Sequence, residues 1–424
     1  MVIGGGSDAV STIDGSFSQG VLMRVIVLGA GVVGVTTAYY LSQLGCEVTV
    51  VDREPVAGEG ATFGNAGQLS YSFTDALAKP GFVSHLPAMI LGRDKGSKVR
   101  LSPQLMIWGL RFLAQCTSSK ARNNTLSVLR IAMRSAGLMD EIQQKMPFDF
   151  HYRTAGKLVL LSTDAELAAA RAATSLKQKN GCNAVVLSQD EAIAVEPALA
   201  DLGEDFIGAV YSDSDEVADS QLFTIGLKDW LEKEGAATFH FSSTARELVM
   251  HEGRTCGVVL DRGQLEADAV VVCMGAWSRD ILQKAGINPH IMPARGYSIT
   301  LPPGTSAPEV SVTALKHKMV YSRIDGFVRV AGFVDFMGFD TSADNERGRT
   351  LLHTAEQFAP RAADYHADDA PVWGGFRPMR PDGQPQVGQT AVPGLFVNVG
   401  HGMLGWTLAC ATAFDAAQAV ANVH

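Results

Sequence analysis

The sequence predicts an α/β fold (α+β overall) in two parts: a doubly wound domain on a parallel sheet, and a second domain on a mainly antiparallel sheet. Three observations support this prediction. Residues 24–52 follow the order strand, glycine-rich turn, helix, strand. Residues 267–273 form an apolar strand of the kind that parallel sheets bury on both faces. Strands with alternating polar and apolar residues dominate 291–335, as in half-buried antiparallel sheets.

The first unit has the order of a Rossmann-type dinucleotide site. A β-branched strand at 25–28 leads into glycines at G-x-G-x-x-G spacing, and a helix over 32–44 ends at Gly45. A second buried strand at 47–51 then delivers Asp52. A lone glycine motif is a weak signal, but here all parts of the unit arrive in order. The alternative is a glycine-rich turn in an ordinary α/β domain.

Each residue type in this unit has a physical role. Gly29 permits a tight turn, Gly31 lets a pyrophosphate approach the backbone, and Gly34 lets helix and strand pack closely. The phosphates would lie at the helix N-terminus, whose amides and dipole favour anions. Asp52 can accept hydrogen bonds from a ribose diol. The same site is predicted to include Val32, Val33 and Arg53.

Composition excludes several classes of protein. The 424 residues are 46% hydrophobic and carry a net charge of −9, which argues against nucleic acid as a partner. The six cysteines are scattered without a C-x-x-C, so we expect reduced thiols, no metal site and a cytoplasmic location. No apolar run reaches membrane-spanning length. Residues 1–22 lack a signal peptide's basic and apolar regions and are predicted to be a disordered leader.

Further along the chain, a small-residue loop at 58–67 is suited to wrap a ligand. Asp219 is the predicted N-cap of a helix over 220–234, and the strand at 267–273 is expected to rejoin the first sheet. The predicted dinucleotide domain is therefore discontinuous, comprising 23–80, 213–290 and 375–424. The second, substrate-binding domain comprises 81–212 and 291–374. Other expected strands are 157–161, 184–187, 207–211, 245–250, 256–260 and 395–399, with a helix at 164–178.

Residues 93–134 are basic in an acidic protein. Nine lysines and arginines face a single acid, Asp94, beside the apolar segments 86–90 and 105–113. Either these bases form a solvated surface, or they contact an anionic membrane or an acceptor protein.

Five stretches together resemble the D-amino acid oxidase superfamily, and within it the bacterial D-amino acid dehydrogenases. They occur in order over nearly all of 23–424: VIVLGAGVVGVTTAYYLSQLGCEVTVVDREP, NAGQLS, DSQLFT, RGYSIT with GFRPMRPDG, and VNVGHGMLGWTLAC. Three positions depart from the family pattern. Arg295 stands where lysine is usual, Met403 where threonine is usual, and Ala218 where glycine is usual. The last two bear on the preferred substrate side chain.

The resemblance implies a non-covalent FAD cofactor and a D-amino acid substrate. It implies oxidation to an imino acid, hydrolysis to a 2-oxo acid and ammonia, and electrons passed to a quinone or another carrier. Direct hydride transfer from the neutral amine to flavin N5 needs orientation rather than a general base. By resemblance, Asn65, Ala66, Gly67 and Gln68 form the loop near the flavin, and Gly275 closes around the cofactor.

Two further features concern the reaction. Arg377 can hold a substrate carboxylate with a planar, bidentate fork, unless it pairs with a structural acid such as Asp382. The stretch 400–405 is expected to open the last helix beside the flavin, where the positive helix end would stabilise reduced flavin. The cofactor site thus gains Arg377, Gly400, Gly402, Met403, Leu404 and Gly405. The predicted catalytic set is Arg377, Tyr297, Tyr321 and His401, with no residue assigned as a base.

Two other functions stay open at this point. One is an oxidase of the same fold that uses oxygen and acts on glycine, sarcosine, D-proline or hydroxyproline. The other is a non-catalytic flavin-binding protein. A quinone acceptor together with the basic segment also predicts peripheral contact with the inner face of the cell membrane.

Overall fold

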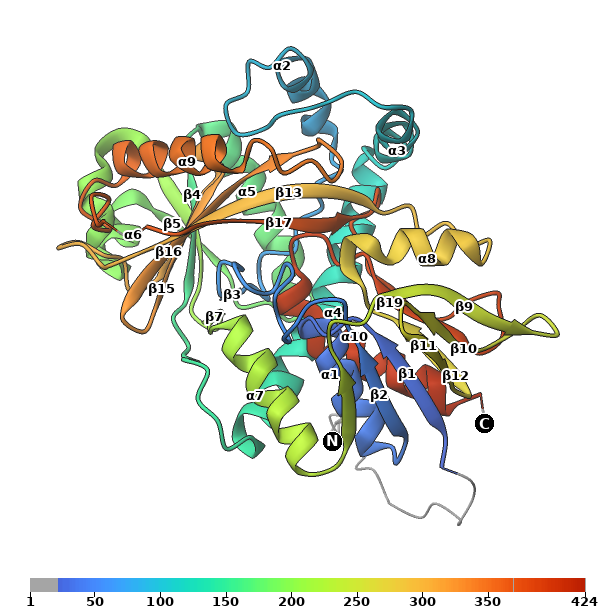
Figure 1. Ribbon diagram of the computed structural model, residues 1–424. Coiled ribbons are helices and arrows are strands. Elements are labelled where there is room, and N and C mark those ends of the chain that lie inside the picture. Colours follow the sequence, from blue (N-terminus) through green and yellow to red (C-terminus); the bar gives the residue numbers. More distant parts are fainter. Residues whose placement is uncertain (1–21, 369, 424) are drawn as a thin grey trace, which may run out of the picture.

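The computed structural model describes residues 22–368 and 370–423, which are built around two large sheets (Figure 1). The predicted leader, residues 1–22, lies outside the described residues except for Leu22. The first sheet has the strand order β18-β19-β12-β1-β2-β8, and all its neighbours are parallel except β18 and β19. Its strands are Gln386–Gln389, Leu395–Val399, Ala269–Val272, Arg24–Leu28, Glu47–Val51 and Ala237–His240. β12 pairs with β1, which confirms that the chain returns to the first sheet.

Both faces of this sheet are covered, which explains its uninterrupted apolar strands. Val25 and Val27 of β1 pack into one core, whereas Ile26 and Leu28 pack into another. Helices α1 (Val32–Gln43), α7 (Ser220–Lys233) and α10 (Gly405–Ala421) cover the first face. The second face meets α8 (Ser278–Lys284) and a three-stranded sheet of β9 (Ala245–His251), β10 (Arg254–Leu260) and β11 (Gly263–Glu266).

The second sheet has the order β17-β13-β16-β15-β14-β4-β6-β5, and only β14 and β4 are parallel neighbours. Its strands are Val372–Met379, Met292–Leu301, Phe327–Asp335, Met319–Ile324, Ser311–Ala314, Lys157–Leu161, Gly208–Ser212 and Val185–Ser188. One face packs against α6 (Gln189–Val195) and α9 (Asp344–Phe358) in a separate core. This arrangement confirms a mainly antiparallel second sheet.

The remaining elements lie around these two sheets. They are α2 (Leu86–Ile90), α3 (Pro103–Leu113), α4 (Ser118–Lys145), α5 (Asp164–Gln178), the short pair β3 (Gln68–Leu69) and β7 (Glu216–Val217), and 3-10 turns at Pro80–His85, Pro197–Asp205, Gly275–Trp277 and Leu315–His317. Asp219 caps α7 as predicted, because its side chain accepts hydrogen bonds from the amides of Gln221 and Leu222 at 2.8 and 3.0 Å.

The structure differs from the predicted elements in three places. The last helix begins at Gly405 rather than Gly400, because Gly400 (φ +82°) and Gly402 (φ +58°) adopt left-handed conformations that no right-handed helix contains. Strand β17 crosses the predicted domain boundary at 374/375 and lies wholly in the second sheet. Helix α4, predicted in the substrate-binding part, packs in the core of the first sheet against α10. The rest of the domain division stays a prediction.

Over the described residues, no helix is long and apolar enough to cross a membrane. The same part of the chain holds no group of three histidine, cysteine, aspartate or glutamate residues that could bind a metal ion. All six cysteines are free thiols, and Cys182, Cys273 and Cys410 are buried.

Candidate active site

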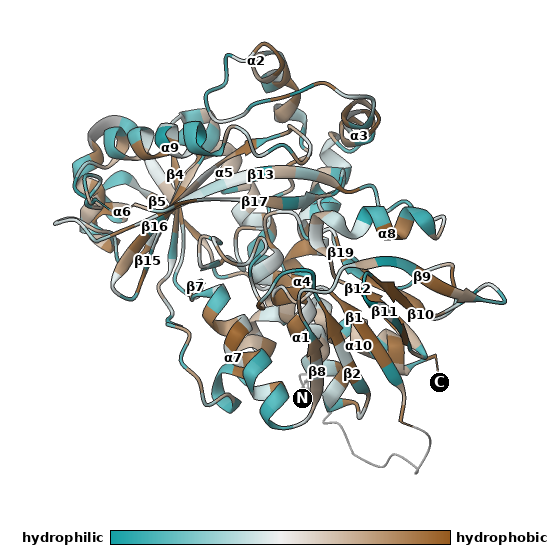
Figure 2. Ribbon diagram, in the orientation of Figure 1, coloured by the Kyte–Doolittle hydropathy of each residue, from teal (hydrophilic) through white to brown (hydrophobic). Residues whose placement is uncertain are grey.

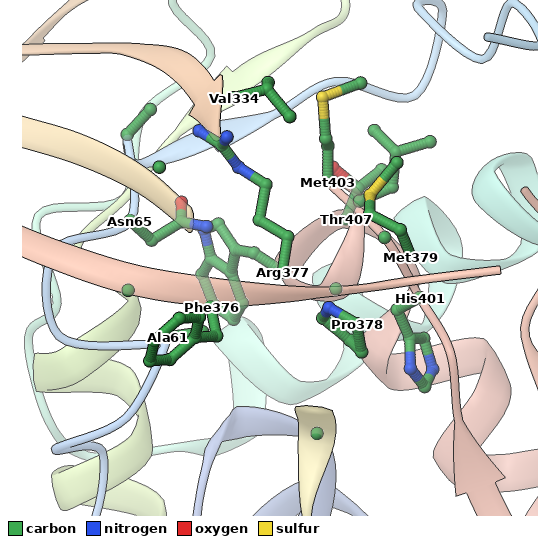
Figure 3. A pocket seen from close by; sticks show the side chains of 18 of the residues that line it. Ala61, Asn65, Val334, Phe376, Arg377, Pro378, Met379, His401, Met403 and Thr407 are labelled. Atoms are coloured by element: carbon green, nitrogen blue, oxygen red, sulfur yellow. The ribbon is translucent and has the colours of Figure 1, made fainter. Parts of the chain in front are cut away.

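A cavity of about 1100 Å³ extends from the start of α1 to the open face of the second sheet. It is lined by the first turn of α1, the loop 58–68, the loop 401–407 and strands β13–β17. Figure 3 shows part of this lining, with Asn65, Arg377, Met403 and Thr407 around one space. The glycine motif and Arg377, which lie far apart in sequence, therefore line one cavity.

The glycines at the start of α1 take two different positions. Gly29 and Gly31 line the cavity, and a Cβ on Gly31 would meet only the Thr62 hydroxyl, at 3.3 Å. Gly34 lies behind the wall, where a Cβ would come within 1.8 Å of the Gly29 carbonyl oxygen. This position requires glycine for helix–strand packing, as predicted for the third glycine. Thr62, which the sequence did not single out, accepts a hydrogen bond from the Val32 amide at 3.1 Å.

Asp52 lines the same end of the cavity as Gly31, Val32 and Val33. Its carboxylate accepts hydrogen bonds from the amides of Ala30, at 2.5 Å, and Glu54, at 2.9 Å. Burial raises the pKa of this carboxyl, and the two amide bonds oppose that shift. Asp52 therefore holds the glycine turn in place as well as facing the cavity. Beside it, the guanidinium of Arg53 lies 3.8 Å from the ring centre of Trp277, next to the cavity-lining Gly275.

These residues fit an adenine dinucleotide, since a helix N-terminus, a glycine without steric obstruction and a carboxylate face one cavity. We expect Asp52→Ala to raise the Kd for FAD about 10- to 150-fold, because a charge-assisted hydrogen bond contributes about 1.5–3 kcal/mol. Fluorescence of FAD titrated with apoprotein measures this Kd. Glu47→Ala, which removes an exposed acid from the strand that precedes Asp52, is the control. An unchanged Kd in Asp52→Ala would exclude Asp52 from the cofactor site.

The loop 64–68 crosses the open face of the second sheet. Asn65, Ala66 and Gln68 line the cavity, whereas Gly67 (φ +73°) forms the turn behind them. The Asn65 side-chain oxygen accepts a hydrogen bond from the Gly67 amide at 2.9 Å, and the Asn65 backbone carbonyl oxygen accepts one from Arg329 Nη1 at 3.0 Å. The loop is thus fixed to β16 by a buried arginine that the sequence analysis missed.

The loop before α10 forms another wall of the cavity. His401, Gly402, Met403, Leu404 and Gly405 line it, while Gly400 does not. His401 Nε2 lies 3.0 Å from the Thr412 hydroxyl, and burial lowers the pKa of this imidazole to about 4, so it is neutral. A neutral, hydrogen-bonded histidine serves as a structural support here. Thr407, a residue not predicted, accepts a hydrogen bond from the Ser70 amide at 3.0 Å and so joins this wall to the end of β3.

Arg377 is half-buried, and its guanidinium lies over Gly296, where any Cβ would collide with it. Nη1 donates to the Phe333 carbonyl oxygen at 2.7 Å. Among the described residues no carboxylate lies within ion-pair distance of Arg377. Asp382, the alternative partner considered from the sequence, pairs with Arg380 at 3.2 Å instead. Burial lowers the pKa of Arg377 to about 10, so the side chain stays charged at neutral pH.

Two other arginines near this sheet are already paired. Arg295 pairs with Asp344 through two of its nitrogens, and Arg323 pairs with Glu309. Neither is free to take a substrate carboxylate without losing its acid. Phe333, whose carbonyl orients Arg377, has a left-handed backbone (φ +62°) beside a register shift between β13 and β16. No sequence pattern marks that β-bulge.

The two predicted tyrosines are engaged elsewhere. Tyr297 lines the cavity, but its hydroxyl donates to buried Asp335 at 2.9 Å, and Arg347 pairs with the same carboxylate. Tyr321 lies in the core behind the second sheet and donates to the Ala355 carbonyl oxygen at 3.0 Å. Burial raises the pKa of both phenols, so neither is a base at neutral pH.

Residues 24–419 match the family model of the FAD-dependent oxidoreductases named DAO. The chain belongs to this family. It is 40% identical over 412 residues to D-amino acid dehydrogenase 2 of Ralstonia nicotianae, covering 94% of this chain and 97% of that protein. It is 34% identical over 392 residues to D-amino acid dehydrogenase of Vibrio vulnificus, covering 92% and 93%.

Solved structures agree on the fold. L-proline dehydrogenase from P. horikoshii has a TM-score of 0.73 and 18% identity, covering 95% of this chain and 94% of that one. Glycine oxidase from Geobacillus kaustophilus has a TM-score of 0.72 and 20% identity, covering 94% and 95%. FAD is the cofactor of the family, and the chain is an FAD-dependent oxidoreductase. The cavity has the glycine turn and Asp52 at one end, and Arg377 lines it further along.

Proposed function

We propose that this protein oxidises D-amino acids to 2-oxo acids and ammonia and passes the electrons to a quinone or another carrier. The observation that carries the proposal is Arg377, a half-buried cation without an acid partner among the described residues, which lines the same cavity as the glycine motif. A carboxylate supplies the charge that this guanidinium lacks. The names of the relatives, D-amino acid dehydrogenase, support the amino acid class and its hand.

The residues act mainly by orientation. FAD, when bound, accepts the hydride that leaves the substrate Cα. The amine loses one proton as the C=N bond forms, water then adds, and ammonia leaves as the 2-oxo acid forms. Arg377 holds the carboxylate in one plane, and Phe333 holds Arg377. Such alignment of reactants can lower a barrier by roughly 7–11 kcal/mol.

An anaerobic mixing experiment tests the reaction. We expect D-alanine to bleach the visible absorbance of the oxidised flavin, and L-alanine to leave it unchanged. Bleaching by glycine or sarcosine in preference to D-alanine would favour an amine oxidase. No bleaching by any amine would leave a non-catalytic flavoprotein. The rates at which air and a soluble quinone reoxidise the reduced flavin, with the peroxide yield in air, then identify the acceptor. We expect the quinone to reoxidise the flavin at least tenfold faster than air does.

The proposed acceptor side is the segment of α2 and α3, which projects at the top of Figure 1 and carries hydrophobic residues in Figure 2. The inner side of α3 packs through Trp108 and Phe112, yet its outer side is apolar as well. The exposed apolar residues are Ile90, Leu91, Leu101, Met106, Ile107, Leu110 and Leu113. An apolar patch of this kind marks a surface for a partner or a membrane.

The charge of this segment favours an anionic membrane. Of the bases in residues 93–134, Lys98, Arg100 and Arg134 pair with the protein's own acids. Arg93 and Lys95, between α2 and α3, and Arg111, on α3, have no acid within ion-pair distance among the described residues, and neither do Arg122 and Arg130 on the following helix α4. Phe82, in the turn before α2, and Met89, on α2 itself, line the cavity. Docking of α2 and α3 on the inner face of the cell membrane would therefore bring a lipid-soluble quinone to the cavity wall.

A further inference from the structure

The floor of the cavity continues well past Arg377. One row of the second sheet, formed by Val159, Thr313, Val320 and Ala331 on four neighbouring strands, lines it throughout. On β13 this row meets Ser298, two residues from the glycine that lies under Arg377. The cavity therefore connects Arg377 on β17 with the residues of β4.

Lys157 of β4 lies at the far end of this floor. The residue is 2% exposed and lines the cavity, and its Nζ donates to the Gln68 side chain and lies 5.3 Å from the ring centre of Phe73. Its ammonium has three donors, and a single acceptor is found among the described residues. Lys157 is therefore a buried cation with unused hydrogen bonds at a cavity wall.

A second polar group at this end has no hydrogen-bond partner at all among the described residues. Thr313, which lines the floor and is 4% exposed, has a hydroxyl without a hydrogen bond among the described residues. Buried polar groups are nearly always paired, so both Lys157 and Thr313 indicate a ligand with acceptor atoms.

The nearby acids do not supply these acceptors. Asp215 attracts Lys157 electrostatically, but its oxygens accept hydrogen bonds from Ser72 and Ser212, and no ion pair forms within 4 Å. Asp75 pairs with Lys177, the other buried lysine of the cavity, at 2.7 Å. Lys157 is thus the cation that an incoming anion would meet.

Lys157 on β4 and Arg377 on β17 both extend towards the middle of the second sheet. Gln68, which accepts from Lys157, lies 3.4 Å from the Tyr321 carbonyl oxygen on β15, and Arg377 donates to Phe333 on β16. The open face of β15 and β16 therefore lies between the two cations. An amino acid held by Arg377 can reach Lys157 through an acceptor group at the far end of its side chain, as an acidic side chain provides.

We infer that Lys157 and Thr313 form a side-chain subsite for a carboxylate, so that D-amino acids with an acidic side chain, such as D-glutamate, are preferred substrates. This inference rests on the proposed oxidation of D-amino acids. Lys157 is then a specificity-determining residue, while Arg377 holds the carboxylate common to all substrates.

Anaerobic stopped-flow reduction with D-glutamate, D-glutamine and D-alanine tests the subsite. D-glutamine is the neutral isostere, so the ratio of the D-glutamate to the D-glutamine rate constant isolates the charge. We expect a ratio of at least 10 in the natural protein and near or below 1 in Lys157→Met. Lys145→Met, which removes an exposed lysine of α4, should keep the natural ratio. Equal ratios in the natural protein and Lys157→Met would overturn the inference.

A binding measurement covers the case in which Lys157→Met does not retain flavin. Glutarate and butyrate, which differ by one carboxylate, are titrated into the natural holoprotein and followed by the flavin spectrum. We expect glutarate to bind at least tenfold more tightly, and equal affinities would overturn the subsite. If D-alanine reduces the flavin while glutarate shows no advantage, the subsite fails and the proposed function stands. If no D-amino acid reduces the flavin, the proposed function fails, and the glutarate titration still decides the carboxylate site.

Discussion

Arg377→Lys is expected to lower the second-order rate constant of anaerobic flavin reduction by D-alanine about 10- to 150-fold, with little change in the flavin spectrum. The guanidinium can hold a carboxylate with two parallel hydrogen bonds, whereas an ammonium is a point donor. The loss of one charge-assisted hydrogen bond costs about 1.5–3 kcal/mol, which corresponds to that range. Stopped-flow absorbance gives the rate constant over a series of substrate concentrations.

The burial of this site adds a pH dependence. Desolvation lowers the pKa of Arg377, and the same burial would act on a lysine, which starts from a lower pKa. The cation is present below its folded-state pKa and is lost as the pH rises through it. The variant should therefore lose further activity towards alkaline pH, while the natural arginine keeps its charge.

Arg323→Lys is the matched control, because Arg323 lies on the same sheet but is paired with Glu309. It should reduce its flavin at the natural rate. If Arg323→Lys were slow and Arg377→Lys normal, the carboxylate site would lie at Arg323 and the proposed geometry would be wrong.

The double substitution Ile107→Glu with Leu110→Glu is expected to lower binding to anionic vesicles at least 30-fold. These side chains are 60% and 69% exposed, so they are available for insertion. Burial of such a side chain contributes about 1.5–3 kcal/mol, and two glutamates add repulsion from the lipid charge. Sedimentation with vesicles of phosphatidylcholine and phosphatidylglycerol at low ionic strength measures the bound fraction.

Val185→Glu with Met250→Glu supplies the control, because both side chains are exposed apolar residues outside α2 and α3. It should bind vesicles as the natural protein does. Charge reversal at Arg93 and Lys95, which lack acid partners among the described residues, should also weaken vesicle binding and reduce the salt dependence of that binding. If the natural protein did not sediment with vesicles, the membrane surface would be excluded. Anaerobic flavin reduction should stay unchanged in all these variants.

The glycine motif could be predicted from the sequence because its determinants are local. A tight turn needs glycine at Gly29, close packing needs glycine at Gly34, and the helix between two apolar strands is marked by this glycine turn before it and by Gly45 after it. Asp219 was predictable for the same reason, since an N-cap bonds to amides two and three residues away. Arg377 was identified by its residue type within a stretch that resembles a known family.

The sequence could not decide how such residues are partnered. Arg295, Arg323 and Arg377 are the same residue type, yet two of them pair with acids and one faces the cavity, because strand register sets which side chains meet. The register also sends the Tyr321 side chain into a core and exposes Lys157 to the cavity.

The chain by itself therefore determined the dinucleotide unit, the two kinds of sheet and the arginine, since each depends on neighbours within a few residues or on residue type. Only the tertiary structure decided that the helix α10 starts at Gly405, that Phe333 orients Arg377, and that Lys157 meets Gln68. These contacts join residues 44 and 89 positions apart in the last two cases, and they form because a twisted sheet and its bulges bring distant strands together.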